Sequence, residues 1–374
     1  MSRDSRATGD HETLLQADDL SKVFGGRGLL FRHSRPEVCA VDRVSVSVRR
    51  GETLGIVGET GSGKSTLGRL LIRLLDPSGG RIVFDGRDIT SLAQARMRRL
   101  RHEMQMVFQD PYGALDPRMK VGAIVAEPML VHGAERSGIA RRTAEILEWV
   151  GLAPAMAERY PHEFSGGQRQ RIGIARAMAL DPKLLILDEP VSALDVSIQA
   201  QILNLLRDIQ RQSGVTYIFI AHDLAVVRHI SERVAVMYLG KIVETAARER
   251  LYAAPRHPYT ASLLSAVPLP NLRAERQRKR IALYGEIGSA TALPSGCRFH
   301  PRCFKARLVA AAGGVATTTL PKGVVVPSRC TDSEPPLADD GSGHLAACHF
   351  PLDPSGAEAR DTASFVTGQS RRHS

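Results

Sequence analysis

Apolar residues along the first 250 positions follow two alternating periods. A spacing of two, as at Val44, Val46 and Val48, is typical of a half-buried strand, whereas the leucines between positions 67 and 75 fall on one face of a helix. Short apolar runs predict further strands at 53–57, 81–84, 184–187, 216–220 and 233–237, and a helix over 196–212. This alternation indicates an α/β domain with a largely parallel sheet.

The pattern changes twice along the chain. Between about 91 and 165 it is mainly helical and polar, which predicts a helical subdomain inserted into the α/β domain. Beyond residue 250, prolines and a basic run precede a group of cysteines, and the last residues are polar. We therefore expect an α/β domain over 12–250, a C-terminal extension over 251–352 and a disordered tail over 353–374.

Composition narrows the class of protein. Hydrophobic residues make up 43% of the 374 residues and charged residues 24%, which excludes a collagen, a disulfide scaffold and a wholly disordered chain. No apolar run approaches the roughly 18 residues that span a bilayer, and the polar N-terminus lacks the apolar core of a secretory signal, so we expect a cytoplasmic protein. The net charge of +11 suits nucleic acid or the anionic face of a membrane.

A glycine-rich segment between a predicted strand and a predicted helix matches the P-loop pattern G-x-x-x-x-G-K-[ST]. Its glycines would let backbone N–H groups surround phosphates, Lys64 would add a cation near the β- and γ-phosphates, and Ser65 would offer its hydroxyl to Mg²⁺. A turn that only opens a helix has no need of Lys-Ser here. The expected phosphate-binding residues are Gly58, Glu59, Thr60, Gly61, Ser62, Gly63, Lys64, Ser65 and Thr66.

Two carboxylates follow the apolar run 184–187. In this Walker B form, Asp188 would hold Mg²⁺ directly or through water, and Glu189 would polarise a water for in-line attack on the γ-phosphate. A strand that simply meets a polar loop would have the same sequence. The P-loop earlier in the chain favours the catalytic interpretation.

A second helix opens with two glycines, in the segment Ser165, Gly166, Gly167 and Gln168. A helix N-terminus of this kind can bind phosphate. Since the P-loop already provides for this chain's own nucleotide, the segment implies a nucleotide that approaches from a partner subunit. The alternative is a helix capped by Ser165, which we expect to leave the glycines and the glutamine unexplained.

The order of these motifs, continued by Ser192-Ala193-Leu194-Asp195 and Ala221-His222-Asp223, resembles the nucleotide-binding subunit of an ATP-binding cassette (ABC) transporter over residues 12 to 250. The resemblance implies a RecA-like P-loop NTPase fold and hydrolysis of ATP with Mg²⁺. It makes Gln109 a Mg²⁺ and γ-phosphate sensor, His222 a switch histidine beside that phosphate, Asp195 a contact across a dimer, and Phe24 a platform for adenine.

Each of these four residues also has an ordinary structural interpretation. Gln109 could be a polar loop residue, His222 a neighbour of a helix cap, and Asp195 the N-cap of the helix that follows. Phe24 could be a core residue. Only their occurrence together, in this order, favours nucleotide chemistry.

The C-terminal extension resembles that of ATPase subunits of oligopeptide, dipeptide and nickel importers, on the basis of His257-Pro258-Tyr259-Thr260 and the leucines after it. This implies an ATPase at the cytoplasmic face of the membrane that energises import of peptides, or alternatively of nickel or another small solute. The implied partners are a second, similar or identical ATPase subunit, two membrane permeases and an extracytoplasmic solute-binding protein.

Four of the five cysteines lie in the last quarter of the chain: Cys297, Cys303, Cys330 and Cys348. Four thiolates in a reducing compartment suit an iron–sulfur cluster or Zn²⁺, and some members of the importer family carry a [4Fe–4S] cluster at such a place. The gap of 26 residues between Cys303 and Cys330 is longer than the family's. Four unligated thiols are therefore the alternative.

Parts of the sequence also suit two other classes of function. A soluble ABC ATPase acting on nucleic acid or ribosomes would suit the positive charge, but such proteins usually carry two cassettes or a long coiled-coil insertion, and this chain has neither. A subunit that binds ATP but hydrolyses it poorly would suit a paired cassette, but Glu189 indicates a competent ATPase.

Overall fold

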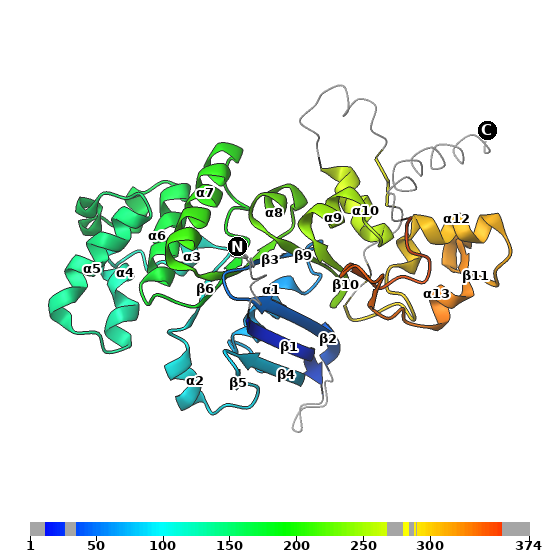
Figure 1. Cartoon of the computed structure of the whole chain (residues 1–374), viewed down its shortest axis with the longest axis horizontal. Coiled ribbons are helices and arrows are strands. Elements are labelled where there is room, and N and C mark those ends of the chain that lie inside the picture. The colour runs from blue at the N-terminus through cyan, green and yellow to red at the C-terminus, as the bar shows by residue number, and fades with distance from the viewer. Residues whose placement is uncertain (1–11, 27–34, 268–279, 284–287, 289, 354–374) are drawn as a thin grey trace, which may run out of the picture.

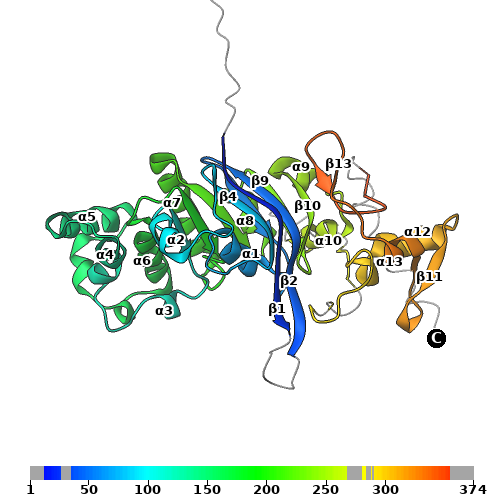
Figure 2. The same ribbon diagram turned by 90° about the horizontal axis from the view of Figure 1, so that it is seen from below.

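The computed structural model describes residues 12–26, 35–267, 280–283, 288 and 290–353. The predicted tail lies outside the described residues apart from Asp353. Three parts are visible in Figure 1: a helical lobe, a central region that contains both large sheets, and a C-terminal lobe on the opposite side from the helices. The view from below places the same parts in a row (Figure 2).

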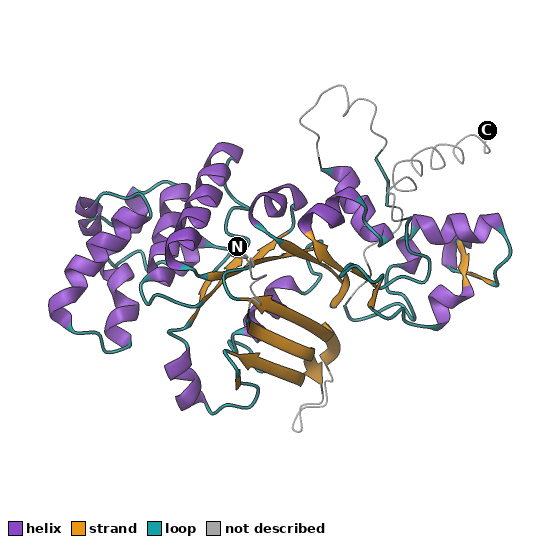
Figure 3. Cartoon of the chain, viewed as in Figure 1, coloured by secondary structure: helices purple, strands orange, loops and turns teal. Residues whose placement is uncertain are grey.

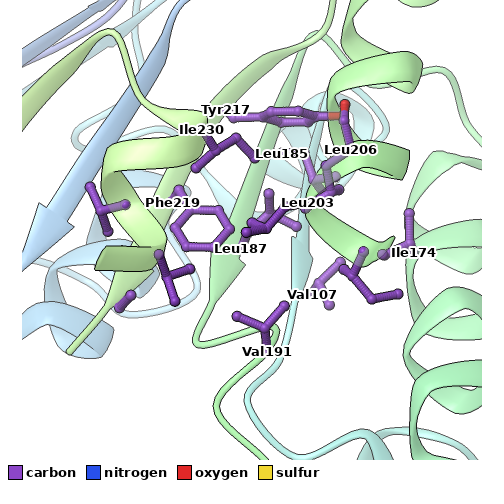
Figure 4. Close-up of a cluster of buried hydrophobic side chains, with 14 of the residues drawn as sticks. Val107, Ile174, Leu185, Leu187, Val191, Leu203, Leu206, Tyr217, Phe219 and Ile230 are labelled. Atoms are coloured by element: carbon purple, nitrogen blue, oxygen red, sulfur yellow. The ribbon is translucent and has the colours of Figure 1, made fainter. Parts of the chain in front are cut away.

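A parallel sheet forms the centre of the molecule (Figure 3). Its neighbouring strands are, in order, β9 (Arg233–Tyr238), β3 (Thr53–Val57), β8 (Thr216–Ala221), β7 (Leu184–Asp188) and β6 (Met104–Val107). Both faces of the sheet are buried, as parallel sheets require. Leu185 and Leu187 pack with Tyr217 and Phe219 on the face covered by α7 (Val196–Ser213), as Figure 4 shows, while Ile186 packs on the other face.

A second, antiparallel sheet covers that other face together with α1 (Lys64–Leu71). Its strand order is β2 (Arg35–Arg49), β1 (Thr13–Gly26), β4 (Gly79–Phe84) and β5 (Arg87–Asp88). The predicted valine alternation lies near the C-terminal end of the long strand β2. The expected α/β fold is therefore present, with an antiparallel sheet that the alternation of strands and helices did not indicate.

The helical lobe is built from α3 (Pro111–Ala114), α4 (Val121–Val131), α5 (Arg136–Trp149) and α6 (Gly166–Met178), with short 3₁₀ turns at Pro154–Glu158 and Pro161–Glu163. The segment expected to be helical over about 91–165 also contains α2 (Gln94–Leu100) and strand β6. Because β6 pairs in parallel with β7, its four residues belong to the central sheet rather than to the helical lobe.

The cassette sheet continues into the C-terminal extension. After α8 (Leu224–Ile230), β10 (Lys241–Ala247) pairs antiparallel with β9, and β14 (Leu345–Ala346) and β13 (Ala338–Asp339) extend the same sheet beyond β10. The rest of the extension contains α9 (Arg248–Ala253), α10 (Pro258–Ala266), 3₁₀ turns at His300–Arg302 and Pro321–Gly323, α12 (Phe304–Ala312), β11 (Thr317–Thr319), β12 (Val325–Pro327) and α13 (Ser328–Asp332).

An aromatic cluster joins the extension to the cassette. The rings of Tyr238, Tyr259 and Phe299 lie with their centroids 4.7 to 5.4 Å apart, and all three side chains are buried. Tyr238 belongs to β9, whereas the other two come from the extension. The extension is thus packed on the cassette through a shared core. Among the described residues, no helix combines the length and the apolar character that crossing a bilayer requires.

His257, the N-cap of α10, generates a prediction about acid stability. Its ring is 1% exposed and accepts a hydrogen bond from the Tyr259 N–H at 3.1 Å. Burial lowers the pKa of His257 to about 4, although the Glu244 carboxylate opposes the shift. Between pH 6.5 and 4 the unfolded chain therefore binds a proton that the folded chain does not, so acidification destabilises the fold.

We expect this histidine alone to remove about 2 kcal/mol from the free energy of unfolding between pH 7 and pH 5. Denaturant titrations at the two pH values measure the loss. His257→Asn keeps a capping oxygen and should show a smaller pH-dependent loss than the wild type, whereas the exposed His229→Asn should not. Equal losses in all three proteins would contradict the assignment.

Candidate nucleotide-binding site

The P-loop connects β3 to α1, and contacts with neighbouring strands require two of its glycines. A Cβ atom at Gly58 would lie 2.1 Å from the Met237 carbonyl oxygen. One at Gly63, whose φ is +103°, would lie 2.2 Å from the Ala40 oxygen. Any side chain at either position would displace the loop. The first N–H groups of α1 have no acceptor within their helix and are available to an anion.

Lys64 lies inside this loop, with 4% of its surface exposed. Its Nζ donates hydrogen bonds to the carbonyl oxygens of Gly58 and Glu59, at 2.7 and 3.0 Å. Burial lowers the pKa of Lys64, and the carboxylates of Glu189 and Asp188 oppose the shift. The ammonium group is thus held where a phosphate would add the compensating charge.

Ser65 and Asp188 lie next to each other at the P-loop. The Ser65 hydroxyl donates to Asp188 Oδ1 at 2.8 Å, and Asp188 is 1% exposed. Its other oxygen, Oδ2, is buried and has no hydrogen-bond partner among the described residues. Burial raises the pKa of Asp188. A buried carboxylate oxygen beside a hydroxyl fits Mg²⁺, a hard cation that binds oxygen ligands.

Glu189 lies at the edge of the sheet where the ends of three strands meet. Its backbone has φ of +47°, a left-handed conformation that is uncommon for a residue with a side chain. Its Oε2 accepts a hydrogen bond from Gln109 Nε2 at 3.1 Å and lies 3.3 Å from His222 Nδ1. These residues follow β7, β6 and β8, which are adjacent and parallel, so their carboxyl ends meet at one edge of the sheet. Glu189 and His222 also line a cavity of about 40 Å³, enough for a water molecule.

The Ser165–Gln168 segment begins α6, in another part of the molecule. The Ser165 hydroxyl accepts from the Gln168 N–H at 3.4 Å, and Gln168 Oε1 accepts from the Ser165 N–H at 3.0 Å. This is a capping box, so our expectation that a cap would leave Gln168 unexplained is wrong. Packing accounts for one glycine, because a Cβ at Gly167 would lie 2.6 Å from the Ile198 side chain.

The structure separates the alternatives for two further residues. Phe24 is 39% exposed and has the Lys22 ammonium 5.3 Å from its ring centre, so the core interpretation of Phe24 is wrong. Asp195 does occupy the N-cap position of α7, but its side chain makes no capping hydrogen bond, and the next residue, Val196, is 81% exposed. Gln109 contacts Glu189 rather than the Ser65–Asp188 pair.

Sequence analysis missed two contacts to the P-loop from the C-terminal extension. The Tyr259 hydroxyl accepts a hydrogen bond from the Glu59 N–H at 2.9 Å, and the Arg302 guanidinium forms an ion pair with the Glu59 carboxylate. The motif around His257 includes Tyr259, but there it indicated only a family resemblance and no contact. No local pattern indicated Arg302.

The four C-terminal cysteines converge despite their spacing. All four line one cavity of about 10 Å³, and the Cys297 N–H donates to the Cys330 carbonyl oxygen at 2.9 Å. The long gap folds as α12, a β11–β12 hairpin and α13, which returns Cys330 to the cluster. Burial raises the pKa of Cys330 to about 11 and that of Cys348 to about 12.

The donor set of this cluster suits iron or zinc, but the available space is that of a single water molecule. Nor do the described residues contain three or more His, Cys, Asp or Glu side chains arranged to hold a metal ion. The thiols would have to separate to admit a cluster.

Comparison with known proteins identifies the class of this chain. Residues 41–192 match the family described as "ABC transporter", and residues 243–308 match "Oligopeptide/dipeptide transporter, C-terminal region". The dimeric ATP-binding cassette MJ0796 bound to ADP and Pi has a similar fold, with a TM-score of 0.56 and 26% identity over 63% of this chain and 98% of that one. The fold and site are those of an ABC ATPase.

Two curated relatives define the family more closely. The chain is 48% identical to the oligopeptide transport ATP-binding protein AppF of Bacillus subtilis, over 91% of this chain and 98% of that protein. It is also 48% identical to a probable peptide ABC transporter ATP-binding protein of Sinorhizobium fredii, over 90% of each. The chain therefore belongs to the ATP-binding subunits of the oligopeptide/dipeptide ABC transporter family.

The buried Oδ2 atom of Asp188, which has no hydrogen-bond partner among the described residues, leads to a prediction about metal dependence. Asp188→Asn preserves the shape but removes the charge that a divalent cation needs. We expect the variant to lose the enhancement of nucleotide affinity by Mg²⁺ and to hydrolyse ATP about 100-fold more slowly. Nucleotide titrations with and without Mg²⁺ measure this. The exposed Asp208→Asn on α7 is the control, and an undiminished Mg²⁺ effect in Asp188→Asn would contradict the assignment.

Proposed function

We propose that this chain is the ATP-hydrolysing subunit of a peptide importer and that Glu189 is its catalytic base. The observation that carries the proposal is the shared contact of Gln109 and His222 with the Glu189 carboxylate, beside a cavity of water size. Glu189 would accept a proton from the attacking water, and His222 and Gln109 would orient that carboxylate toward the γ-phosphate.

The remaining residues of the site would bind the nucleotide. Lys64 and backbone N–H groups of the P-loop and of the start of α1 would hold the phosphates, and Phe24 would stack on adenine. Ser65 and Asp188 would hold Mg²⁺, with Gln109 approaching when the site closes. When bound, the ion would neutralise charge on the β- and γ-phosphates.

A second ATPase subunit is proposed to complete the site. Among the described residues, no hydrogen bond or ion pair links the Ser165–Gln168 segment to the P-loop of the same chain, and the two lie on separate parts of the fold (Figure 1). This supports a dimer in which the Ser165–Gln168 segment and Asp195 of one subunit face the nucleotide of the other. The partner would be an identical or a similar chain.

A cavity beside Gln109 supports the proposed contact with a permease. It measures about 270 Å³ and is bordered by β6, α3, α4 and α6. Phe108, which lines it, is 42% exposed, and the buried Gln170 Nε2 has no hydrogen-bond partner in the described part of the chain. A hollow of mixed polar and apolar lining, with an exposed phenylalanine and an unsatisfied amide, suits a docking helix. We propose that this face contacts one permease at the cytoplasmic side of the membrane, in an assembly that also contains a second permease and an extracytoplasmic solute-binding protein.

Peptides are the proposed cargo because the names of the similar curated proteins describe oligopeptide or peptide transport. Nickel and nucleic acid, the alternatives from sequence, have no such support here. Transport of labelled peptides and of ⁶³Ni into cells that express this protein, compared with a strain lacking its gene, distinguishes the two cargoes.

We further propose that Cys297, Cys303, Cys330 and Cys348 bind a [4Fe–4S] cluster. The convergence of the four thiols on one cavity supports it, and binding would move the thiols apart. Protein purified without oxygen should contain about four iron and four sulfide per chain, and Cys303→Ser should lose both. Zinc in their place, or neither metal, would contradict the proposal.

Removing the Glu189 charge should separate binding from hydrolysis. In Glu189→Gln the amide cannot accept the proton of the attacking water, so we expect ATP turnover to fall at least about 100-fold while MgATP is bound. The variant should then accumulate as an ATP-bound dimer with the second ATPase subunit, as measured by size-exclusion chromatography with light scattering.

The exposed Glu148→Gln on α5 is the matched control and should turn over ATP as the wild type does. If Glu189→Gln also retained normal turnover, Glu189 would not be the base.

A further inference from the structure

Arg302 reaches the P-loop from the C-terminal extension. Its guanidinium donates to both oxygens of the Glu59 carboxylate, at 2.8 and 3.1 Å. Arg302 is 8% exposed and the Glu59 side chain 21%. Two parallel N–H···O bonds of this kind fix both the position and the orientation of the carboxylate. The second residue of the P-loop is therefore held by a residue more than 240 positions later in the chain.

The same extension holds the backbone of Glu59. The Tyr259 hydroxyl accepts from the Glu59 N–H, and the Tyr259 ring packs against that of Tyr238 in β9. The buried ring of Phe299 packs against both tyrosines. Arg302 thus sits in a rigid frame that joins the extension to β9, and it does not depend on a mobile surface loop for its position.

The charge of Glu59 explains why this contact matters for nucleotide. A P-loop binds phosphates through N–H dipoles and a lysine, so a carboxylate in the loop opposes that attraction. Lys64 Nζ also donates to the Glu59 carbonyl oxygen. Displacement of Glu59 would therefore both expose a negative charge to the triphosphate and move one acceptor of the lysine that binds it.

We propose that Arg302 is a positioning residue for ATP, which neutralises Glu59 and holds it in place, so that the C-terminal extension completes the nucleotide site of the cassette. The inference rests on the proposed binding of MgATP by this P-loop. It assigns the extension a part in ATP affinity, in addition to any part in the cysteine cluster.

Four variants of the full chain test the proposal through the dissociation constant of MgATP, with KM, kcat and melting temperature measured alongside. Arg302→Gln leaves the Glu59 charge uncompensated, so the dissociation constant and KM should rise about tenfold, with kcat changed less than twofold. Glu59→Gln leaves the Arg302 charge facing the phosphates, so MgATP should bind about threefold more tightly. The double variant carries neither charge and should return to within about threefold of wild type.

The fourth variant, Arg298→Gln, is the matched control. Arg298 lies in the same loop and is similarly buried, but its guanidinium pairs with Asp42 instead of the P-loop. Its MgATP affinity should equal that of the wild type.

The order of affinities distinguishes charge compensation from simple structural support. A purely structural clamp would weaken binding equally in Arg302→Gln, Glu59→Gln and the double variant, and that result would overturn the proposal, as would wild-type affinity in Arg302→Gln. If Arg302→Gln does not fold, weaker binding by Glu59→Gln would overturn it and tighter binding would support it. A wild-type chain that binds no MgATP would instead refute the proposed function.

Discussion

Burial of a lysine and a carboxylate of opposite charge at the P-loop is the constraint on which this structure depends. Lys64 and Asp188 lie almost fully inside the protein. Burial lowers the pKa of Lys64 and raises that of Asp188, so it favours the neutral form of each group. Burying a charged group away from water costs free energy unless other charges or hydrogen bonds replace its contacts with water. The loop carbonyls hold Lys64 and the Ser65 hydroxyl holds Asp188, but only a phosphate and a cation would satisfy both. We therefore expect the site to favour binding of a phosphate together with a cation.

Parallel strands convert distant sequence positions into one site. Gln109, Glu189 and His222 are separated by 80 and 33 residues, yet each follows a strand that ends at the same edge of the sheet. The close approach of Gly58 to Met237 and of Gly63 to Ala40 holds the P-loop at this edge. Backbone hydrogen bonding between strands, together with apolar packing on both faces, thus determines the geometry on which catalysis depends.

Sequence reasoning was most successful where a motif is short and local. The P-loop, the Asp188–Glu189 pair and the central strands follow from spacing, because phosphate binding and strand burial both impose residue types on consecutive positions. It was less successful for the antiparallel sheet of β1, β2, β4 and β5, because the alternation of strands and helices does not show which strands pair with each other. It could not predict the Arg302–Glu59 pair, because such a contact depends on how a separate extension packs. The expectation that a helix cap would leave Gln168 unexplained was wrong, since capping and phosphate binding favour similar residues.

The position of β14 has a consequence for the solubility of shortened chains. This strand pairs with β10, which would otherwise form the edge of the central sheet, and the two-residue β13 then ends the sheet. An open strand edge is a template on which other chains can add by backbone hydrogen bonding. The extension thus protects the cassette from self-association, and a fragment that ends soon after β10 would present an adhesive edge to its neighbours in solution.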